Sequence, residues 1–278
     1  MVRKELTSFI VKTWRADRDR QAELDQLAES YVMQAGITKP PVDPADWCRD
    51  RERIRVHLMH LNGECDGLLV FRGGKFHLFY DPDPHRGRFT FAHEVGHYLI
   101  DEHHAAIRSG VGPPKCFTGF VTDVKMEREA DWFAAGLLMP RFLFARSCPD
   151  PNIKDIRETA KVFDVSLTSA ILRTITFTDI RTAVVVTVAG KIKWYFPSEG
   201  MKLSGIRTAN IGCQPHPRSK TAAVYANLRG LPSEPIDGGK CSASDWFATA
   251  YDDPDLWEEV LPVPAFDQVI TLLTFYDD

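Results

Sequence analysis

The chain has 278 residues, of which 44% are hydrophobic and 26% are charged, a composition typical of globular proteins with one large or two modest domains. Its formal net charge of −4 excludes a general electrostatic attraction to nucleic acid or to an anionic membrane. The first twenty residues have charges on both sides of a short apolar run, and no later stretch is apolar enough to span a bilayer. We therefore expect a soluble, cytoplasmic protein that makes no contact with membranes.

Six cysteines are scattered along the chain without any CxxC pair. This spacing suits neither a disulfide framework nor a thiolate metal site, so reduced and mostly buried thiols are expected. The six are Cys48, Cys65, Cys116, Cys148, Cys213 and Cys241.

The amino-terminal part is predicted to hold one long helix and a small sheet. Between Glu5 and Gln34 apolar residues recur at intervals of three and four, which is typical of an amphipathic helix. The stretch GITKPPVDP then ends this helix. A short helix over 46–53 should follow, and then three apolar runs that we expect to form antiparallel strands. The three strands are predicted at 54–61, 66–72 and 75–81.

The middle of the chain is predicted to be mainly helical. A helix is expected around FTFAHEVGHYLI, followed by a loop rich in Gly and Pro over 109–119. The stretch KMEREADWFAAGLLMP predicts a further helix that Pro140 ends, because a residue before proline avoids the helical region. Two short helices should follow, over 153–163 and 166–176.

The last part of the chain has strand-like runs separated by segments rich in Gly, Pro and Ser. TAVVVTVAG and KIKWYF predict a hairpin, and FDQVITLLTFYDD predicts a final strand. We therefore expect an α+β fold in three parts. These are a domain over 1–145 with a small sheet and helices, a helical segment over 146–179 and a separate α+β domain over 180–278.

Two histidines and a glutamate form an HExxH pattern in the central helix. His93 and His97 are four residues apart, so their imidazoles share one helix face and can bind a single ion. Glu94 stands beside them, where its carboxylate can take a proton from a metal-activated water. Apolar residues on the same face, such as Phe89 and Ile100, should bury the site against the sheet. The alternative is a pair of core histidines with internal hydrogen bonds.

A catalytic zinc ion usually takes three protein ligands and leaves one position open for water. His103 follows His97 by six residues, as in the longer HExxHxxGxxH pattern, but Ile100 replaces the glycine at which that pattern turns. Without the turn, a continued helix would carry His103 about 9 Å further along the axis, so we do not expect it to be a ligand. We expect His104 even less than His103 to be a zinc ligand. Both histidines suit a polar helix end, where the helix dipole favours cations.

The following helix offers a better third ligand. Glu127 and Asp131 are four residues apart, so one carboxylate can bind the ion while the other accepts the N–H of a ligand histidine. Ala130 and Ala134 lie on the same face, where small side chains allow a close approach to the histidine helix. Glu129 points away from that face. The alternative is a solvated, charged helix turn.

The stretches RGRFTFAHEVGHYLI and EREADWFAAGLLMP, preceded by PPVD and DGLLV, resemble the ImmA/IrrE family of bacterial metallo-endopeptidases, which is of the gluzincin type. The resemblance covers residues 20–176 and implies a zincin-like protease fold for the first domain. It implies a zinc ion as cofactor and Glu94 as the general base. It also makes Asp131 the hydrogen-bond partner of a ligand histidine. The zinc ligands that it implies are His93, His97 and Glu127.

The resemblance further implies that a helix-turn-helix and a GAF-like sensor domain follow the protease, as in the longer, IrrE-like members. As the substrate it implies a helix-turn-helix repressor of the XRE type, cleaved to relieve repression in a stress response or during induction of a mobile element. Two alternatives stay open. One is a regulatory interaction protein that is catalytically silent and acts through its helix-turn-helix-like and C-terminal parts. The other is a zinc hydrolase with a different substrate.

The sequence also contains weaker indications of function. IRETAKVFDVSLTSAILRTI has the outline of a helix-turn-helix, but only Arg173 could read a base, so we do not expect specific DNA binding. His216 lies between prolines and is expected to be an exposed loop residue. A hydrogen-bond donor to the developing oxyanion is also required. The candidates near the motif are Tyr80, Arg86, Arg88 and Tyr98.

Overall fold

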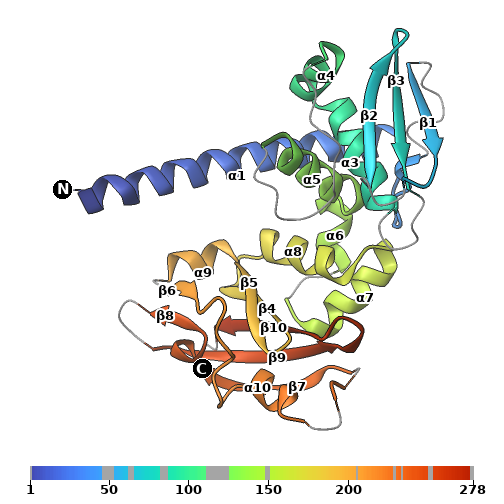
Figure 1. Ribbon diagram of the computed structural model, residues 1–278. Helices are drawn as coiled ribbons and strands as arrows, with labels where there is room; N and C mark the ends of the chain where they lie inside the picture. The colour runs from blue at the N-terminus through green and yellow to red at the C-terminus, as the bar shows by residue number, and fades with distance from the viewer. Residues whose placement is uncertain are drawn as a thin grey trace. The chain divides into compact units, whose positions relative to one another are not determined.

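The computed structural model describes residues 2–45, 53–61, 66–81, 87–110, 125–147, 151–204, 206–227, 230–232, 234–249 and 253–275, without the side chains of 2–16 and 206–208. The chain folds as two compact units. Unit 1 consists of Met1–Arg146 with Val162–Val165, and unit 2 of Ser147–Lys161 with Ser166–Asp278. Figure 1 colours the elements of unit 1 from blue to green and most of those of unit 2 from yellow to red.

Unit 1 begins with the long helix α1 (Val2–Gln34), which confirms the helix expected from the apolar spacing. Its buried residues Leu24 and Ala28 face the helix α5 (Lys125–Leu138). Gly136 of α5 makes this contact close, because a Cβ atom there would come 3.0 Å from the Cβ of Ala28. The absence of a side chain at this position therefore sets the distance between the two helices.

Unit 1 also contains a three-stranded sheet, whose strands lie in the order β1-β3-β2. The strands are β1 (Ile54–Leu58), β2 (Gly67–Arg72) and β3 (Lys75–Tyr80). β2 and β3 are antiparallel, as expected, but β1 pairs with β3 in parallel. The expectation of a fully antiparallel sheet is thus wrong for β1. Consecutive strands still reverse direction, but β1 joins the far edge of β3 instead of pairing with β2.

The helix α3 (Gly87–Leu99) lies between this sheet and α5. The short helices α4 (Asp101–Arg108) and α6 (Arg141–Ser147) follow α3 and α5 respectively. α3 and α4 are separated by Ile100 alone, which has an extended conformation (φ −77°, ψ 116°). The chain therefore changes direction directly after the motif helix.

Unit 2 is built on a five-stranded antiparallel sheet in the order β5-β4-β10-β9-β7. The hairpin of β4 and β5 and the final strand confirm the sequence expectation. Ala189 and Gly190 connect the hairpin with positive φ angles of 48° and 72°, as a tight two-residue turn requires. The strands are β4 (Thr182–Val188), β5 (Lys191–Pro197), β7 (Ile236–Ser242), β9 (Asp255–Val263) and β10 (Gln268–Phe275).

One side of this sheet covers a hydrophobic core around Trp246, which has no exposed surface. Shorter elements of unit 2 pack against this core or, in the case of the helix that carries Val224, in a second hydrophobic cluster. They are α9 (Glu199–Leu203), β6 (Ile206–Ala209), α10 (Lys220–Tyr225) and β8 (Phe247–Thr249). The helices α7 (Ile153–Phe163) and α8 (Leu167–Phe177) confirm the two short helices expected there.

The α+β class is confirmed, with a β-rich carboxy-terminal region that is separate from the domain carrying the motif. The three-part division at 145 and 179 and the GAF-like character of the last part stay predictions. The short helix expected over 46–53 and most of the loop over 109–119 lie outside the described residues. Among the residues that are described, none of the helices is both long and apolar enough to cross a membrane.

Candidate metal centre

The motif helix α3 carries its polar residues into the interior of unit 1. His93, Glu94 and His97 have no exposed surface. Apolar neighbours on the same helix, such as Phe91 and Val95, are also buried, because the sheet covers one side of α3 and α5 the other. Burying three polar side chains is costly unless they have partners or bind an ion, so their surroundings decide what the site can do.

Three side chains from two helices converge on one point. The Nε2 atoms of His93 and His97 are 3.1 Å apart. Oε2 of Glu127 lies 3.2 Å from Nε2 of His93, and Oε1 lies 3.4 Å from Nε2 of His97. Together these residues form a buried group with the composition of a metal site, as the sequence had indicated.

The spacing of the three donors fits a tetrahedral zinc ion. Bonds of about 2.0–2.1 Å at tetrahedral angles put neighbouring ligand atoms about 3.3–3.4 Å apart. Here the two nitrogens are 3.1 Å apart, and each lies 3.2 or 3.4 Å from one of the two oxygens of the Glu127 carboxylate, which can offer either oxygen to the ion. Two imidazole nitrogens and one carboxylate oxygen are also a donor set that catalytic zinc sites use, with a fourth position left open. The residues present therefore fit the metal that the HExxH pattern predicts.

Small residues allow the two helices of the site to approach each other. Ala130 and Ala134 of α5 are fully buried, as predicted. On α3, a Cβ atom at Gly96 would come 3.1 Å from the ring of Phe133 and 3.4 Å from the backbone of Ala130. A larger side chain here would separate Glu127 from the two histidines.

His93 is oriented by a carboxylate behind it. Its Nδ1 lies 2.8 Å from Oδ1 of Asp131, which is also buried. An ionised carboxylate only accepts hydrogen bonds, so Nδ1 carries a proton and Nε2 is the nitrogen that faces the other donors and could bind a metal. The structure thus brings Asp131 to the side of His93 where the sequence predicted it.

His97 contacts another histidine instead of a carboxylate. Its Nδ1 lies 3.1 Å from Nδ1 of His103, which is buried in α4. The expectation that His103 lies too far along the helix axis is wrong, because the chain turns at Ile100 without needing a glycine. An extended φ/ψ pair is open to any residue. His103 nevertheless contacts Nδ1 of His97, on the side of the ring away from Nε2 and from the converging donors.

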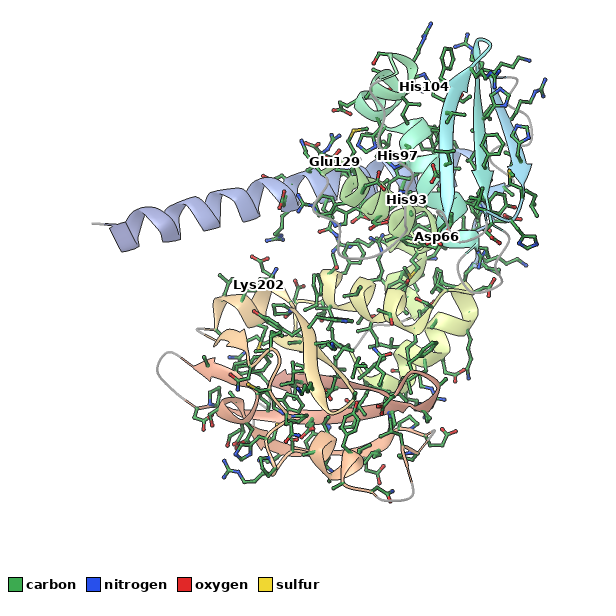
Figure 2. All side chains as sticks on the ribbon, viewed as in Figure 1. Asp66, His93, His97, His104, Glu129 and Lys202 are labelled. Carbon is green, nitrogen blue, oxygen red and sulfur yellow. The ribbon has the colours of Figure 1, made fainter. Side chains whose placement is uncertain are left out.

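Glu129 points away from Glu127, as expected, but it lies in the interior. Its Oε2 is 3.0 Å from Nε2 of His103, and only 3% of the residue is exposed. Arg20 of α1 contacts both carboxylate oxygens at 3.3 Å. Burial raises the pKa of Glu129, but the bonds to Arg20 and His103 outweigh it and lower that pKa. Figure 2 shows Glu129 near His97 within this unit.

His104, the neighbour of His103, has no role in the group. Its Nδ1 lies 2.9 Å from the backbone oxygen of Tyr98, and its ring packs on Phe76. That His104 is not a ligand stays a prediction.

Glu94 is the most isolated polar group of the site. Both carboxylate oxygens are buried, and they have no hydrogen-bond partner among the described residues. Burial raises the pKa of Glu94 to about 8, an effect that His93 weakens and Glu127 strengthens. A divalent cation held by the neighbouring donors would favour the ionised form. Such a carboxylate is suited to exchanging protons with a reacting group near neutral pH.

The two histidines differ in charge in the absence of a cation. Burial lowers the pKa of His97, to about 4, so its imidazole is neutral. Burial also lowers the pKa of His93, but the hydrogen bonds with Asp131 and Glu127 outweigh it and raise that pKa to about 10. Metal ligands are neutral imidazoles, so binding of an ion here would release the proton of His93.

Residues 53–174 match the model of a peptidase family that is described as the IrrE N-terminal-like domain. The chain therefore contains an IrrE N-terminal-like domain. The match runs from β1 into α8 and includes Glu94 and all three converging donors. It confirms the family resemblance drawn from the sequence.

Comparison with whole proteins shows the fold alone. No curated protein sequence matches the chain. Among solved structures, a transcriptional regulator of Mycobacterium tuberculosis is similar, with a TM-score of 0.56 and 17% sequence identity. The similarity covers 92% of this chain and 78% of the regulator, so it extends beyond the IrrE N-terminal-like domain into unit 2.

Of the expected oxyanion donors in this IrrE N-terminal-like domain, Arg88 is engaged in other hydrogen bonds. The Arg88 guanidinium bonds to the backbone oxygens of Val42 and Phe163 and to Asp164, which anchors the start of α3. The ring of Tyr80 packs against Phe91, and that of Tyr98 against Phe76 and His104. Arg86 lies outside the described residues.

The sequence analysis missed one residue of the site, Gly67 at the start of β2. A Cβ atom at this position would lie 2.6 Å from Oε1 of Glu94, so β2 passes directly over the carboxylate. The signal was present in the stretch DGLLV, in which a glycine opens a strand. Glycine at such a place often marks a close approach of the backbone to another group.

The weaker candidates lie apart from the site. Arg173 in α8 is 3% exposed and stacks on the ring of Phe177, so the single side chain expected to read a base is buried. His216 is exposed, as expected, and its Nδ1 lies 3.1 Å from Asp245 of the same unit.

Proposed function

We propose that the IrrE N-terminal-like domain is a zinc endopeptidase of the gluzincin type. His93, His97 and Glu127 would bind the ion, Asp131 would orient His93, and Glu94 would be the general base. The observation that carries the proposal is the convergence of three buried donors at separations of 3.1–3.4 Å beside a carboxylate without hydrogen-bond partners in the described part of the chain. Two core histidines with only a structural role would not need both Nε2 atoms turned toward each other.

The proposed chemistry divides between the metal and the protein. When bound, zinc would polarise the scissile carbonyl and lower the pKa of the attacking water. Glu94 would take a proton from that water and later pass it to the leaving amine, because its carboxylate faces the same buried region. Once His93 has released its second proton, each ring would keep a proton on Nδ1 and offer its Nε2 lone pair to the ion.

For the substrate we propose a helix-turn-helix repressor of the XRE type, cut once so that repression ends, for example in a stress response or on induction of a mobile element. The family resemblance supports this, and a peptidase that acts in the cytoplasm, the location expected from the sequence, needs narrow specificity. Unit 2 would add recognition surface, or sense a signal, as a GAF-like domain would. Binding energy from remote contacts would then mean that short peptides spanning the cleavage site are cut poorly.

A second candidate is a regulatory interaction protein that uses the protease scaffold without catalysis. The presence of Glu94 together with all three donors argues against it, because a silent scaffold has no need for a buried carboxylate that lacks hydrogen bonds in the described residues. The burial of Arg173 also argues against direct regulation through DNA.

The deciding experiment incubates the zinc-loaded chain with a helix-turn-helix repressor encoded beside it and looks for one discrete product by mass spectrometry. The Glu94→Gln variant, loaded in the same way, is the matched control and should leave the repressor intact. Indiscriminate digestion of unrelated unfolded proteins would refute the narrow specificity. An uncut repressor whose DNA affinity still changes would favour the interaction protein.

A further inference from the structure

The second ligand histidine is connected to the long amino-terminal helix by a chain of polar contacts that the motif does not predict. Nδ1 of His97 lies 3.1 Å from Nδ1 of His103, and Nε2 of His103 lies 3.0 Å from Oε2 of Glu129. Arg20 holds Glu129 at 3.3 Å. The four residues come from four different helices, and three of them are at most 3% exposed.

The donors and acceptors of this chain have one arrangement that leaves His97 able to bind a metal. Glu129 is ion-paired with Arg20, so its carboxylate accepts and Nε2 of His103 must donate. A neutral His103 then has a bare Nδ1, which can only accept. His97 must therefore carry its proton on Nδ1, and its Nε2 lone pair faces the donors of His93 and Glu127.

From this geometry we propose that His103 is a positioning residue for the metal centre, which fixes the tautomer and ring orientation of His97 and transmits the charge of Glu129 to it. The inference rests on the proposed metal site. His103 does for His97 what Asp131 does for His93, but through one additional imidazole ring. Partners of this kind commonly change metal affinity by about 10–100-fold when they are removed.

The relay, which is the chain of contacts from His97 through His103 to Glu129, depends on the turn at Ile100. If α3 continued, His103 would lie about 9 Å further along the axis than His97. Instead the backbone is extended at Ile100, whose side chain is 1% exposed, and α4 brings His103 back beside His97. The restart of the helix thus serves the site even though α4 contributes no donor to the metal.

The test measures the zinc dissociation constant of the full chain by competition with a chelator. His103→Phe keeps the ring volume but removes both hydrogen bonds, and it should weaken zinc binding by about 10–100-fold. His103→Asn keeps an acceptor near the position of Nδ1 and should lose less. The matched control is His104→Phe, because His104 is the adjacent histidine and its contacts in the described part of the chain are a backbone oxygen and ring neighbours outside the site.

A second readout separates positioning from a structural role. Nitrogen-15 NMR of the histidine rings identifies which nitrogen of His97 carries the proton and how fast that proton exchanges with water. In the wild type we expect a slowly exchanging proton on Nδ1. In the His103→Phe variant it should exchange faster or be shared between the two nitrogens, whereas a residue that only fills space would leave this signal unchanged.

The two proposals fail in different ways. Zinc binding that survives His97→Ala at wild-type strength would refute the metal site itself. A strong loss with His97→Ala, together with wild-type affinity and an unchanged His97 proton in both His103 variants, would overturn the positioning role alone. If His103→Phe does not fold, the affinity and NMR spectrum of His103→Asn decide.

Discussion

The backbone of Gly67 lies directly against the carboxylate of Glu94. A Cβ atom at Gly67 would come 2.6 Å from Oε1 of Glu94 and 2.7 Å from Cγ2 of Thr90, which is closer than a real side chain can be. Only glycine therefore lets the first residue of β2 approach α3 this closely. The strand and the helix together fix where the proposed general base lies.

Replacing this glycine should damage catalysis more than metal binding. In Gly67→Ala the new methyl group must displace Glu94, and a misplacement of about 1 Å at a reacting group can cost about 100-fold in rate. Zinc content should remain near one equivalent, because the atoms nearest to the new methyl group belong to Glu94 and Thr90 and not to a proposed ligand. Arg72→Ala, at the exposed end of the same strand, is the control and should keep full activity. Equal activity in both variants would contradict the role given to this contact.

The Glu94→Gln variant tests the base directly. The amide has the size of the carboxylate but cannot take a proton, so zinc should remain bound while turnover falls by about 10²–10⁴-fold. Metal analysis and turnover number on the same preparation check this. Undiminished turnover would mean that another group is the base.

The ligand assignment predicts an order of metal affinities among variants of α5. Glu127→Ala removes a donor and should abolish most zinc binding. Glu129→Ala breaks the relay to His97 and should weaken binding less. Arg128→Ala should bind like the wild type, because Arg128 stacks on Trp132 and pairs with Asp17. Dialysis followed by metal analysis gives the order, and equal losses from Glu127→Ala and Arg128→Ala would refute the assignment.

The local part of this site could be predicted because a helix has a fixed period. Spacings of four placed His93 with His97 and Glu127 with Asp131, and both pairs share a face as expected. The small side chains of Ala130 and Ala134 likewise predicted the close approach of α5 to α3, since the absence of bulk is visible in the sequence.

The remaining features depend on contacts that no local pattern specifies. Arg20 and Glu129 meet across 109 positions, and the parallel pairing of β1 with β3 depends on the path of the chain between the strands. The turn at Ile100 was missed because only glycine was considered able to make it. The acidic pair Asp101 and Glu102, typical of the first turn of a new helix, was the available signal.

In unit 2, a buried carboxylate caps a helix and should be important for stability. Oε1 of Glu258 accepts hydrogen bonds from the backbone and hydroxyl of Thr221, and Oε2 accepts from the backbone of Lys220, at the start of α10. Glu258→Gln must turn an NH₂ group toward one of these donors, which should cost about 1–3 kcal/mol. Thermal or urea unfolding would measure it. Asp255→Asn, an exposed change on the same strand, should stay within about 0.5 kcal/mol of the wild type.

The thiol of Cys241 should be unreactive in the native protein. Burial raises its pKa to about 12, and the nearby carboxylates of Glu258 and Asp245 add to this. Because the thiolate is the reactive form, a thiol with this pKa is ionised to only about 0.01% at pH 8, whereas a free cysteine with a pKa of about 8.5 is ionised to about 25%.

Cys213 is exposed. A short treatment with iodoacetamide, followed by peptide mapping, should therefore label Cys213 and leave Cys241 unmodified. Labelling of Cys241 should appear only after denaturation or at strongly alkaline pH. Equal labelling rates for the two thiols in the native protein would show that Cys241 is more accessible to solvent than its half-buried position allows.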